Sequence, residues 1–282
     1  MSTVLEAFAL WALGASVGAV GTIVGAGGGF ILVPILLLLY PGMEAKTVSA
    51  IALTTVLANS TSGSIAYLRQ HRVDLYSATI LAIATIPGAI LGALVVSRVS
   101  SQSFALLFAA LLLGALSMVI AGPRLRAMRD SAETGPVGTL SIRRQFRDRV
   151  GVVHTYVYSV PIAVASSLLA GFASSFFGVG GGFIHVPVLI ALLSFPVHVA
   201  TATSQFVLAV MSSGGVLSHF AAGHYASLED GIKAGALATG AVIGAQIGAR
   251  IAVRLPANAI TRLLGAMLLL LAVQALVAAL RG

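Results

Sequence analysis

The chain of 282 residues contains no cysteine, which excludes disulfide bonds and thiolate metal sites. Charged residues make up only 9% of it, whereas soluble domains carry roughly 25%. Hydrophobic residues make up 58%, and the mean hydropathy is +1.03. Because such a chain cannot cover a water-facing surface, we predict a polytopic membrane protein, with no cofactor and no metal.

Acidic residues are also scarce, since the chain has only eight and all of them fall near segment ends or in loops. This placement disfavours a carboxylate proton relay and a cation site built from acidic rings. It favours an anionic or neutral substrate. A P-loop lysine is missing as well, so the chain alone is not an ATP-driven pump.

Positive charge is concentrated in one part of the chain. The net charge is +8, and seven arginines lie between Arg124 and Arg149. In a membrane protein this excess sets the orientation, so residues 122–150 are expected to form a solvated cytoplasmic loop, and nucleic acid is not an expected partner. The expected partners are the lipid bilayer and a small anion, and the oligomeric state stays open between monomer and homodimer.

Hydrophobic runs separated by polar clusters define ten segments, most of them near the roughly 20 residues needed to cross a bilayer. The second and seventh are shorter, and each directly follows a run of glycines. The segments lie near residues 4–23, 30–40, 47–68, 75–97, 101–121, 154–175, 183–194, 199–221, 228–252 and 257–280. We therefore predict an all-α membrane protein.

The chain consists of two related halves. A shift of 153 residues aligns GAGGGFILVP, from Gly25 to Pro34, with GVGGGFIHVP, from Gly178 to Pro187. Nine of twelve positions from Gly25 onward are identical in this alignment. The same shift pairs Asn59 with Ser212. The predicted organisation is a transmembrane repeat at 1–121, a basic cytoplasmic linker at 122–153 and a second repeat at 154–282.

The odd number of segments in each half bears on its orientation. If every segment crosses the membrane, the halves are inverted, and 12 basic residues face the cytoplasm against 4 outside. If the short segments are re-entrant, we expect parallel halves, with a split of 11 against 5. The positive-inside rule thus slightly favours inversion.

The glycine runs predict a broken helix in each half, because successive glycines disfavour helix by roughly 1 kcal/mol each relative to alanine. Irregular backbone at membrane depth survives only where it is buried in protein or lines a polar cavity. The free N–H groups at the start of each short helix carry the positive end of the helix dipole. Two such ends brought together predict an anion site near the midplane, made of Gly27, Gly28, Gly29 and Phe30 with Gly180, Gly181, Gly182 and Phe183.

Other glycines follow the small-xxx-small spacing that permits close helix packing. For these a packing role is expected, and they are Gly14/Gly18, Gly88/Gly92, Gly231/Gly235 and Gly240/Gly244/Gly248.

Several neutral polar side chains at membrane depth are expected to line the anion site. Serine and threonine in a span often bond only to their own helix backbone, whereas amide side chains are costlier in lipid. The candidates are Asn59, Thr203, Ser204, Gln205 and His185. His185 is also the most plausible proton carrier, given the shortage of acids.

The paired glycine runs, together with the ATATS stretch at 200–204, resemble the TauE/SafE family of sulfite exporters, a grouping that includes organosulfonate permeases. The resemblance covers nearly the whole chain. It implies transport of small sulfur-containing anions such as sulfite or sulfoacetate, in a bacterial inner membrane. The first half departs from the pattern, reading TVSAIAL at 47–53 where the second half has ATATSQF, so we expect an asymmetric site to which the second half contributes more polar groups.

Two alternatives to a carrier remain at this stage. One is an anion channel. The other is an intramembrane serine protease, in which Ser16 of GASVG at 14–18 would pair with His185 or His219. The G-x-S-x-G pattern requires a strand–turn–helix in a soluble hydrolase, so an enzyme is not the favoured interpretation.

Overall fold

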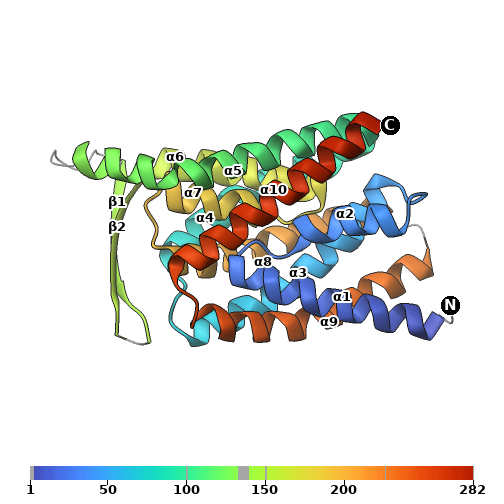
Figure 1. Cartoon of the computed structure of the whole chain (residues 1–282), viewed down its shortest axis with the longest axis horizontal. Coiled ribbons are helices and arrows are strands. Elements are labelled where there is room, and N and C mark those ends of the chain that lie inside the picture. The colour runs from blue at the N-terminus through green and yellow to red at the C-terminus, as the bar shows by residue number, and fades with distance from the viewer. Residues whose placement is uncertain (1–2, 100, 133–139, 150, 226, 282) are drawn as a thin grey trace.

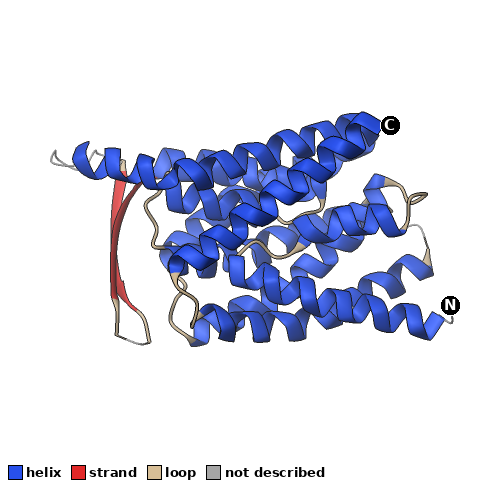
Figure 2. Cartoon of the chain, in the orientation of Figure 1, coloured by secondary structure: helices blue, strands red, loops and turns tan. Residues whose placement is uncertain are grey.

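The computed structural model describes residues 3–99, 101–132, 140–149, 151–225 and 227–281, and its architecture confirms the all-α prediction. Figure 2 shows helices throughout and one two-stranded hairpin at an end of the bundle. The elements are α1 (Thr3–Val24), α2 (Gly29–Leu39), α3 (Ala45–Arg69), α4 (Leu75–Val95), the short 3₁₀ helix η1 (Val96–Arg98), α5 (Ser101–Ala132), β1 (Ser141–Arg147), β2 (Val153–Ser159), α6 (Val160–Phe177), α7 (Gly182–Ala191), α8 (Val197–Ala221), α9 (Leu228–Ala252) and α10 (Ala257–Arg281).

Six of the described helices are long and apolar enough to cross a membrane, namely α1, α4, α6, α8, α9 and α10. Helices α2 and α7 are apolar but shorter. Helix α3 is less apolar, and its polar residues Thr55, Asn59 and Ser60 are buried against other helices rather than exposed to lipid. Burial inside the bundle explains how this helix can stay polar.

Helices α1 and α2 form a hairpin, so the chain leaves α2 at the same end of the bundle at which it entered α1. The Tyr40 hydroxyl, at the end of α2, donates a hydrogen bond to Glu6 Oε1, near the start of α1, at 2.6 Å. The second half repeats this course at the opposite end of the bundle. There Phe195, which follows α7, packs against Tyr156 of β2, the strand that leads into α6, with tilted rings whose centroids lie 4.2 Å apart. Both glycine runs are therefore the tips of re-entrant helix pairs.

These pairs settle how the two halves are related. The prediction that re-entrant short segments give parallel halves is wrong, because the reversal uses two helices and leaves three net crossings in each half. Three is an odd number, so the halves are inverted. Figure 1 agrees, since both termini lie at one end of the bundle and the β1–β2 hairpin lies at the other. The positive-inside rule assigns the hairpin end to the cytoplasm, with the predicted split of 12 basic residues against 4.

The segment between the two repeats is more ordered than the loop that was expected. Helix α5 continues to Ala132, and β1 pairs with β2 in antiparallel register, with Arg144 opposite Tyr156. The expectation of a loop is therefore wrong for residues 122–132, which continue α5, and for residues 141–147, which form β1, and the span predicted from residue 154 begins instead at Val160. Alternation of exposed and partly buried residues along β1 fits a strand with one face on the helices.

Glycine seams join helices from opposite halves. A Cβ added at Gly240 or Gly244 of α9 would collide with carbonyl oxygens of α1, and one at Gly88 or Gly92 of α4 would collide with those of α6. These contacts, and that of Gly14 with α9, confirm a packing role. The prediction is wrong for Gly231 and Gly235, which have no neighbour within 4 Å to meet an added Cβ. The closest helix packing is therefore between the halves, since α1 of the first half packs on α9 of the second and α4 packs on α6.

Candidate functional site

The glycine runs interrupt their helices as predicted. Helix α1 ends at Val24 and α2 begins at Gly29, while α6 ends at Phe177 and α7 begins at Gly182. Positive φ angles occur in both interruptions, 75° at Gly25 and Gly27 and 66° and 65° at Gly178 and Gly180. L-residues with a side chain rarely adopt this conformation, so glycine is needed to turn the chain back within the bundle.

The two interruptions meet at the centre of the molecule. A Cβ added to Gly29 would lie 2.5 Å from the carbonyl oxygen of Val179, in the other run. The rings of Phe30 and Phe183, both fully buried, stack with centroids 6.0 Å apart. The structure thus brings together the two runs that the repeat pairs in sequence.

Some backbone amides at this crossing have no internal partner. The N–H groups of Ile31 and Leu32 bond to the Gly28 carbonyl, and those of Ile184 and His185 bond to the Gly181 carbonyl. Among the described residues, no backbone acceptor is found for the N–H groups of Gly29, Phe30 or Phe183. These are first-turn amides of short helices, where the dipole is positive.

Two apolar side chains lie against the crossing. Val56 of α3 and Leu208 of α8 are the nearest neighbours that an added Cβ at Gly27 would meet, at 3.1 and 3.3 Å. The same two side chains face Gly180, and both are fully buried. In this conformation hydrocarbon covers the glycine backbone on both runs.

A cluster of polar side chains lies beside the first run, at the end of α1. The Thr22 hydroxyl donates to Asn59 Oδ1 at 3.1 Å, and Gln205 Nε2 donates to the Gly21 carbonyl at 3.4 Å. All three side chains are fully buried. Asn59 Nδ2 and Gln205 Oε1 have no hydrogen-bond partner among the described residues. A buried amide group without a partner is costly, so these atoms are candidates to contact a solute.

The equivalent place beside the second run is less polar, and the expectation that the second half contributes more polar groups is wrong here, since Thr22 and Asn59 belong to the first half. Gly63 of α3 faces Thr22 and Gln205, whereas Gly215 of α8 faces Ser175 and Leu53. These contacts show that α3 and α8 are related by 152 residues rather than 153. The predicted pairing of Asn59 with Ser212 is therefore wrong by one residue, and the counterpart of Asn59 is Met211.

Both broken helices are fixed at their ends by a side chain from a long helix. The Tyr67 hydroxyl donates to the Thr22 carbonyl at 2.8 Å. His219 occupies the corresponding place in the other half, and its Nε2 lies 3.1 Å from the Ser175 carbonyl. Because a carbonyl only accepts, this geometry places a proton on His219 Nε2. His219 Nδ1 then accepts from His224 Nδ1, 2.8 Å away, when the ring is neutral.

Three predicted site residues have other surroundings. His185 lies 3.3 Å from the Ser167 hydroxyl through Nε2, and its Nδ1 has no described partner. Thr203 Oγ1 accepts from the Asp74 backbone N–H at 3.2 Å, at the cytoplasmic end of α4. Ser204 is fully buried, and its hydroxyl has no described partner. None of the three shares a hydrogen bond with the Thr22–Asn59–Gln205 cluster.

Ser16, the candidate protease nucleophile, forms no hydrogen bond with a histidine among the described residues. Its hydroxyl donates to the Ala12 carbonyl on its own helix at 2.9 Å, on an exposed face of α1. The bond is the ordinary one for serine within a span.

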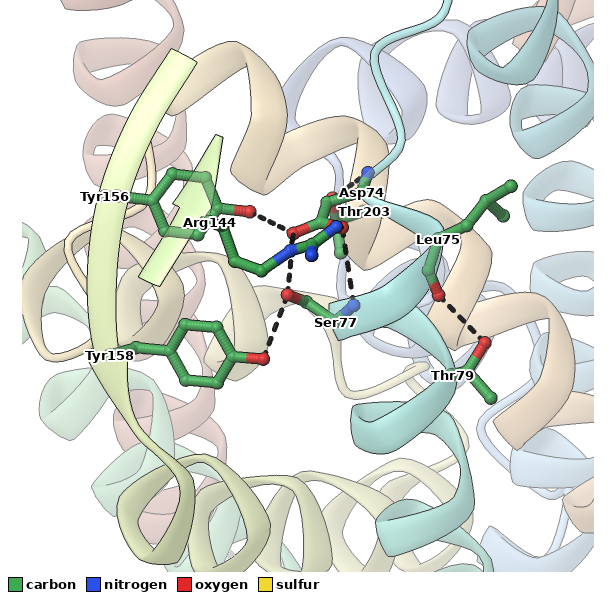
Figure 3. A network of polar contacts seen from close by, with 8 residues as sticks. All are labelled: Asp74, Leu75, Ser77, Thr79, Arg144, Tyr156, Tyr158 and Thr203. Carbon is green, nitrogen blue, oxygen red and sulfur yellow. Dashed lines mark hydrogen bonds and ion pairs between the residues drawn. The ribbon is translucent and has the colours of Figure 1, made fainter. Parts of the chain in front are cut away.

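A second polar network, centred on Asp74, ties the hairpin to the helices (Figure 3). Arg144 of β1 binds both carboxylate oxygens, at 2.8 and 3.0 Å, and the Tyr156 hydroxyl donates to Oδ2 at 2.5 Å. Ser77 also donates to Asp74, and Tyr158 donates to Ser77. Burial raises the pKa of Asp74, but the hydrogen bonds from Arg144, Ser77 and Tyr156 outweigh it and lower the pKa below 3.8.

Sequence reasoning missed Thr22, Tyr67 and the Asp74–Arg144 pair. One usable signal was present for Thr22, since the 153-residue shift pairs it with another hydroxyl residue, Ser175. For Asp74 and Arg144 no signal existed, because 70 residues separate them and only the tertiary structure brings them together.

Comparisons with known proteins agree with this picture. Residues 10–275 match the family described as "Sulfite exporter TauE/SafE". The chain is also 31% identical over 221 residues to a protein of Bacillus subtilis (strain 168) named "Probable membrane transporter protein YunE". The aligned region covers 75% of this chain and 77% of that protein. No solved structure matches the chain.

Proposed function

Because the chain belongs to the TauE/SafE family of sulfite exporters, we propose that it is a secondary carrier of small sulfur-containing anions in a bacterial inner membrane. Sulfite and short organosulfonates such as sulfoacetate are the substrates we favour. Family membership points to a transporter rather than to an enzyme. The observation that carries the proposal is the crossing of two broken helices, with amide N–H groups that lack a backbone partner.

A sulfonate or sulfite suits such a place because it is a compact oxyanion. Its oxygens accept hydrogen bonds from the amides of Gly29, Phe30 and Phe183, at the positive ends of two helix dipoles. Asn59 Nδ2 supplies a side-chain donor beside the first run. No carboxylate of the described residues lies in this region to repel the charge, since the buried acids Asp74, Asp148 and Asp230 lie outside the crossing.

Alternating access then requires Val56 and Leu208 to separate. The glycine seams join α1 to α9 and α4 to α6, so the two sequence halves do not move as units. The moving bodies that we propose are α1, α2, α3 and α9 on one side and α4, α6, α7 and α8 on the other. Besides the crossing itself, their most extensive shared contact is α3 against α8, the helices that carry Val56 and Leu208.

The test is flux into liposomes that contain the purified protein. Saturable uptake of radiolabelled sulfite, inhibited by sulfoacetate but not by taurine methyl ester, is expected from a carrier. A current that does not saturate with anion concentration would indicate the channel instead. Absence of flux and of thermal stabilisation with sulfite, thiosulfate, sulfoacetate, isethionate, taurine and phosphonates would refute the proposal.

Proton coupling through His185 is a separate part of the proposal. His185 is almost fully buried, next to Ser167, in the short helix that follows the second run. A His185→Gln variant is expected to lose the pH dependence of transport while still binding substrate. A wild-type rate that does not change with pH would contradict this part alone.

A further inference from the structure

A cavity of about 270 Å³ opens at the N-terminal end of α4, on the face that the positive-inside rule assigns to the cytoplasm. Its charged lining residues are Arg144, Arg147 and Asp74, and His71 and Tyr76 also contribute. Arg144, Arg147 and Asp74 together give the cavity a net charge of +1. The cavity belongs neither to the glycine crossing nor to the Thr22–Asn59–Gln205 cluster.

Arg144 is fixed by Asp74 and still has guanidinium N–H groups that this pair does not use. Its Nε and Nη2 bind Asp74, which leaves three of the five guanidinium N–H groups unused by that pair. Its guanidinium carbon also lies 4.6 Å from the centre of the Tyr76 ring. A fixed arginine of this kind recognises oxyanions well, because little side-chain entropy remains to be lost on binding.

Arg147 supplies the second positive charge. Its Nε donates to the Gly151 carbonyl at 2.9 Å, and it has no carboxylate partner within the described chain. It is exposed, so its charge reaches solutes that approach the cytoplasmic face. It takes no part in the Asp74 network.

We propose that this cavity is a loading site for small oxyanions, in which the free N–H groups of Arg144 and the charge of Arg147 hold a sulfonate or sulfite before it enters the bundle. The inference rests on the proposed function for the identity of the anion. The site lies beside Thr203, which accepts from the Asp74 backbone, so the anion is loaded next to the start of α8. Helix α8 also carries Gln205 and Leu208, which lie at the deeper site.

The absence of native cysteine makes the test direct. Leu75 lines the cavity and is half exposed, so a Leu75→Cys variant places one thiol there in a chain that has no other. Its modification by an anionic methanethiosulfonate is followed in proteoliposomes, with sulfoacetate as the protecting probe. Sulfite is unsuitable as a probe because it attacks the reagent.

Sulfoacetate is expected to protect the thiol in a saturable manner. Arg147→Gln is expected to raise the half-protecting concentration about tenfold, the factor typical of losing one charge-assisted interaction. Arg143→Gln is the matched control, because Arg143 lies on the same strand but does not line the cavity. Arg147 is outside the Asp74 network, so Arg147→Gln keeps the Arg144–Asp74 pair that joins the hairpin to the helices.

Failure to protect, or an equal effect of Arg143→Gln and Arg147→Gln, would overturn the loading site. Loss of protection in phosphatidylglycerol but not in phosphatidylcholine vesicles would overturn it too, by indicating a lipid headgroup as the occupant. An Asn59→Met variant that keeps protection but loses flux would support two separate sites. Protection without any flux of sulfur anions in the wild type would support the loading site and refute the proposed transport function.

Discussion

The two glycine runs are nearly identical in sequence, yet their surroundings differ. Beside the first run lie Thr22, Asn59 and Gln205, whereas Ser175, Met211 and Leu53 occupy the equivalent places beside the second. The duplicated feature is the backbone break, which only glycine can form. The chemistry beside the break is not duplicated, because neighbouring helices supply it and each helix has diverged separately.

The two ends of the bundle differ in a related way. Asp74 caps α4 and accepts from the Ser77 backbone N–H, while Ser227 caps α9 and accepts from the Asp230 backbone N–H. The capping residue is an acid in the first half and a serine in the second, and the residue three positions later is a serine in the first half and an acid in the second. Only the cytoplasmic acid, Asp74, also binds an arginine from the hairpin.

The largest effect is expected where both runs depend on the same backbone geometry. Gly178→Ala and Gly25→Ala each force a side chain into the left-handed region and against the backbone of Ser49 or Thr201. We expect a loss of roughly 4 kcal/mol or more of stability and no monodisperse protein on gel filtration. Gly214→Ala is the control, since nothing lies within 4 Å of the added Cβ. Normal elution of Gly178→Ala would show that the breaks tolerate a side chain.

The next largest loss of stability is expected at the N-terminal cap of α4, in comparison with the cap of α9. Asp74→Asn leaves Arg144 without its anion, and we expect a loss of roughly 3 kcal/mol in the free energy of unfolding in detergent. Asp230→Asn should cost only about 1 kcal/mol, because no arginine depends on it among the described contacts. Equal losses would show that the hairpin adds nothing to the cytoplasmic cap.

The same pair predicts a pH dependence. The folded-state pKa of Asp74 lies below 3.8, because the hydrogen bonds from Arg144, Ser77 and Tyr156 outweigh the rise caused by burial. A lowered pKa means that the contribution to stability is complete above the unfolded value and is lost as pH falls through the folded value. Thermal unfolding of wild type and Asp74→Asn should therefore differ at pH 6, and the difference should shrink as pH falls through the lowered folded-state pKa of Asp74.

An exchange between the two sides tests whether the polar cluster binds substrate. Asn59→Met copies the second side onto the first, and we expect flux to fall by about 100-fold while the protein stays folded, because a side-chain donor is lost. Met211→Asn places an amide in the apolar counterpart and should cost about 1–3 kcal/mol of stability. Wild-type flux in Asn59→Met would remove Asn59 from the site.

The smallest effect concerns the bonds that fix the helix ends. Tyr67→Phe removes the hydrogen bond to the Thr22 carbonyl, which still accepts from the Gly25 N–H. We expect a loss of about 1 kcal/mol, measured by thermal unfolding. His219→Leu should cost more, because it also leaves His224 without its partner. The reverse order would indicate that the histidine pair is not structural.

Much of the fold was predictable because local composition controls it in a membrane. Apolar runs of about 20 residues give spans, and the glycine runs marked both helix breaks correctly. The orientation of the short helices was not predictable in this way. Whether α2 continues outward or returns depends on contacts such as Tyr40 with Glu6, which local pattern does not contain.

The candidate site was predictable only in part. Asn59 bonds to Thr22, which sequence reasoning left out, and Gln205 bonds to the adjacent Gly21 carbonyl, whereas Thr203 and His185 have other partners. The one-residue change of register between the glycine run and α3 hid the true counterpart of Asn59. Such a change leaves the hydrophobic pattern intact, so only packing reveals it.

The sequence by itself determined a membrane chain of two repeats, each with a glycine break, since hydrophobicity and backbone freedom are properties of the residues themselves. The tertiary structure alone decided the re-entrant course, the polar and apolar sides of the crossing, and the pairing of Asp74 with Arg144. These depend on which side chains from distant segments lie within hydrogen-bonding distance, and that is fixed only when the helices pack.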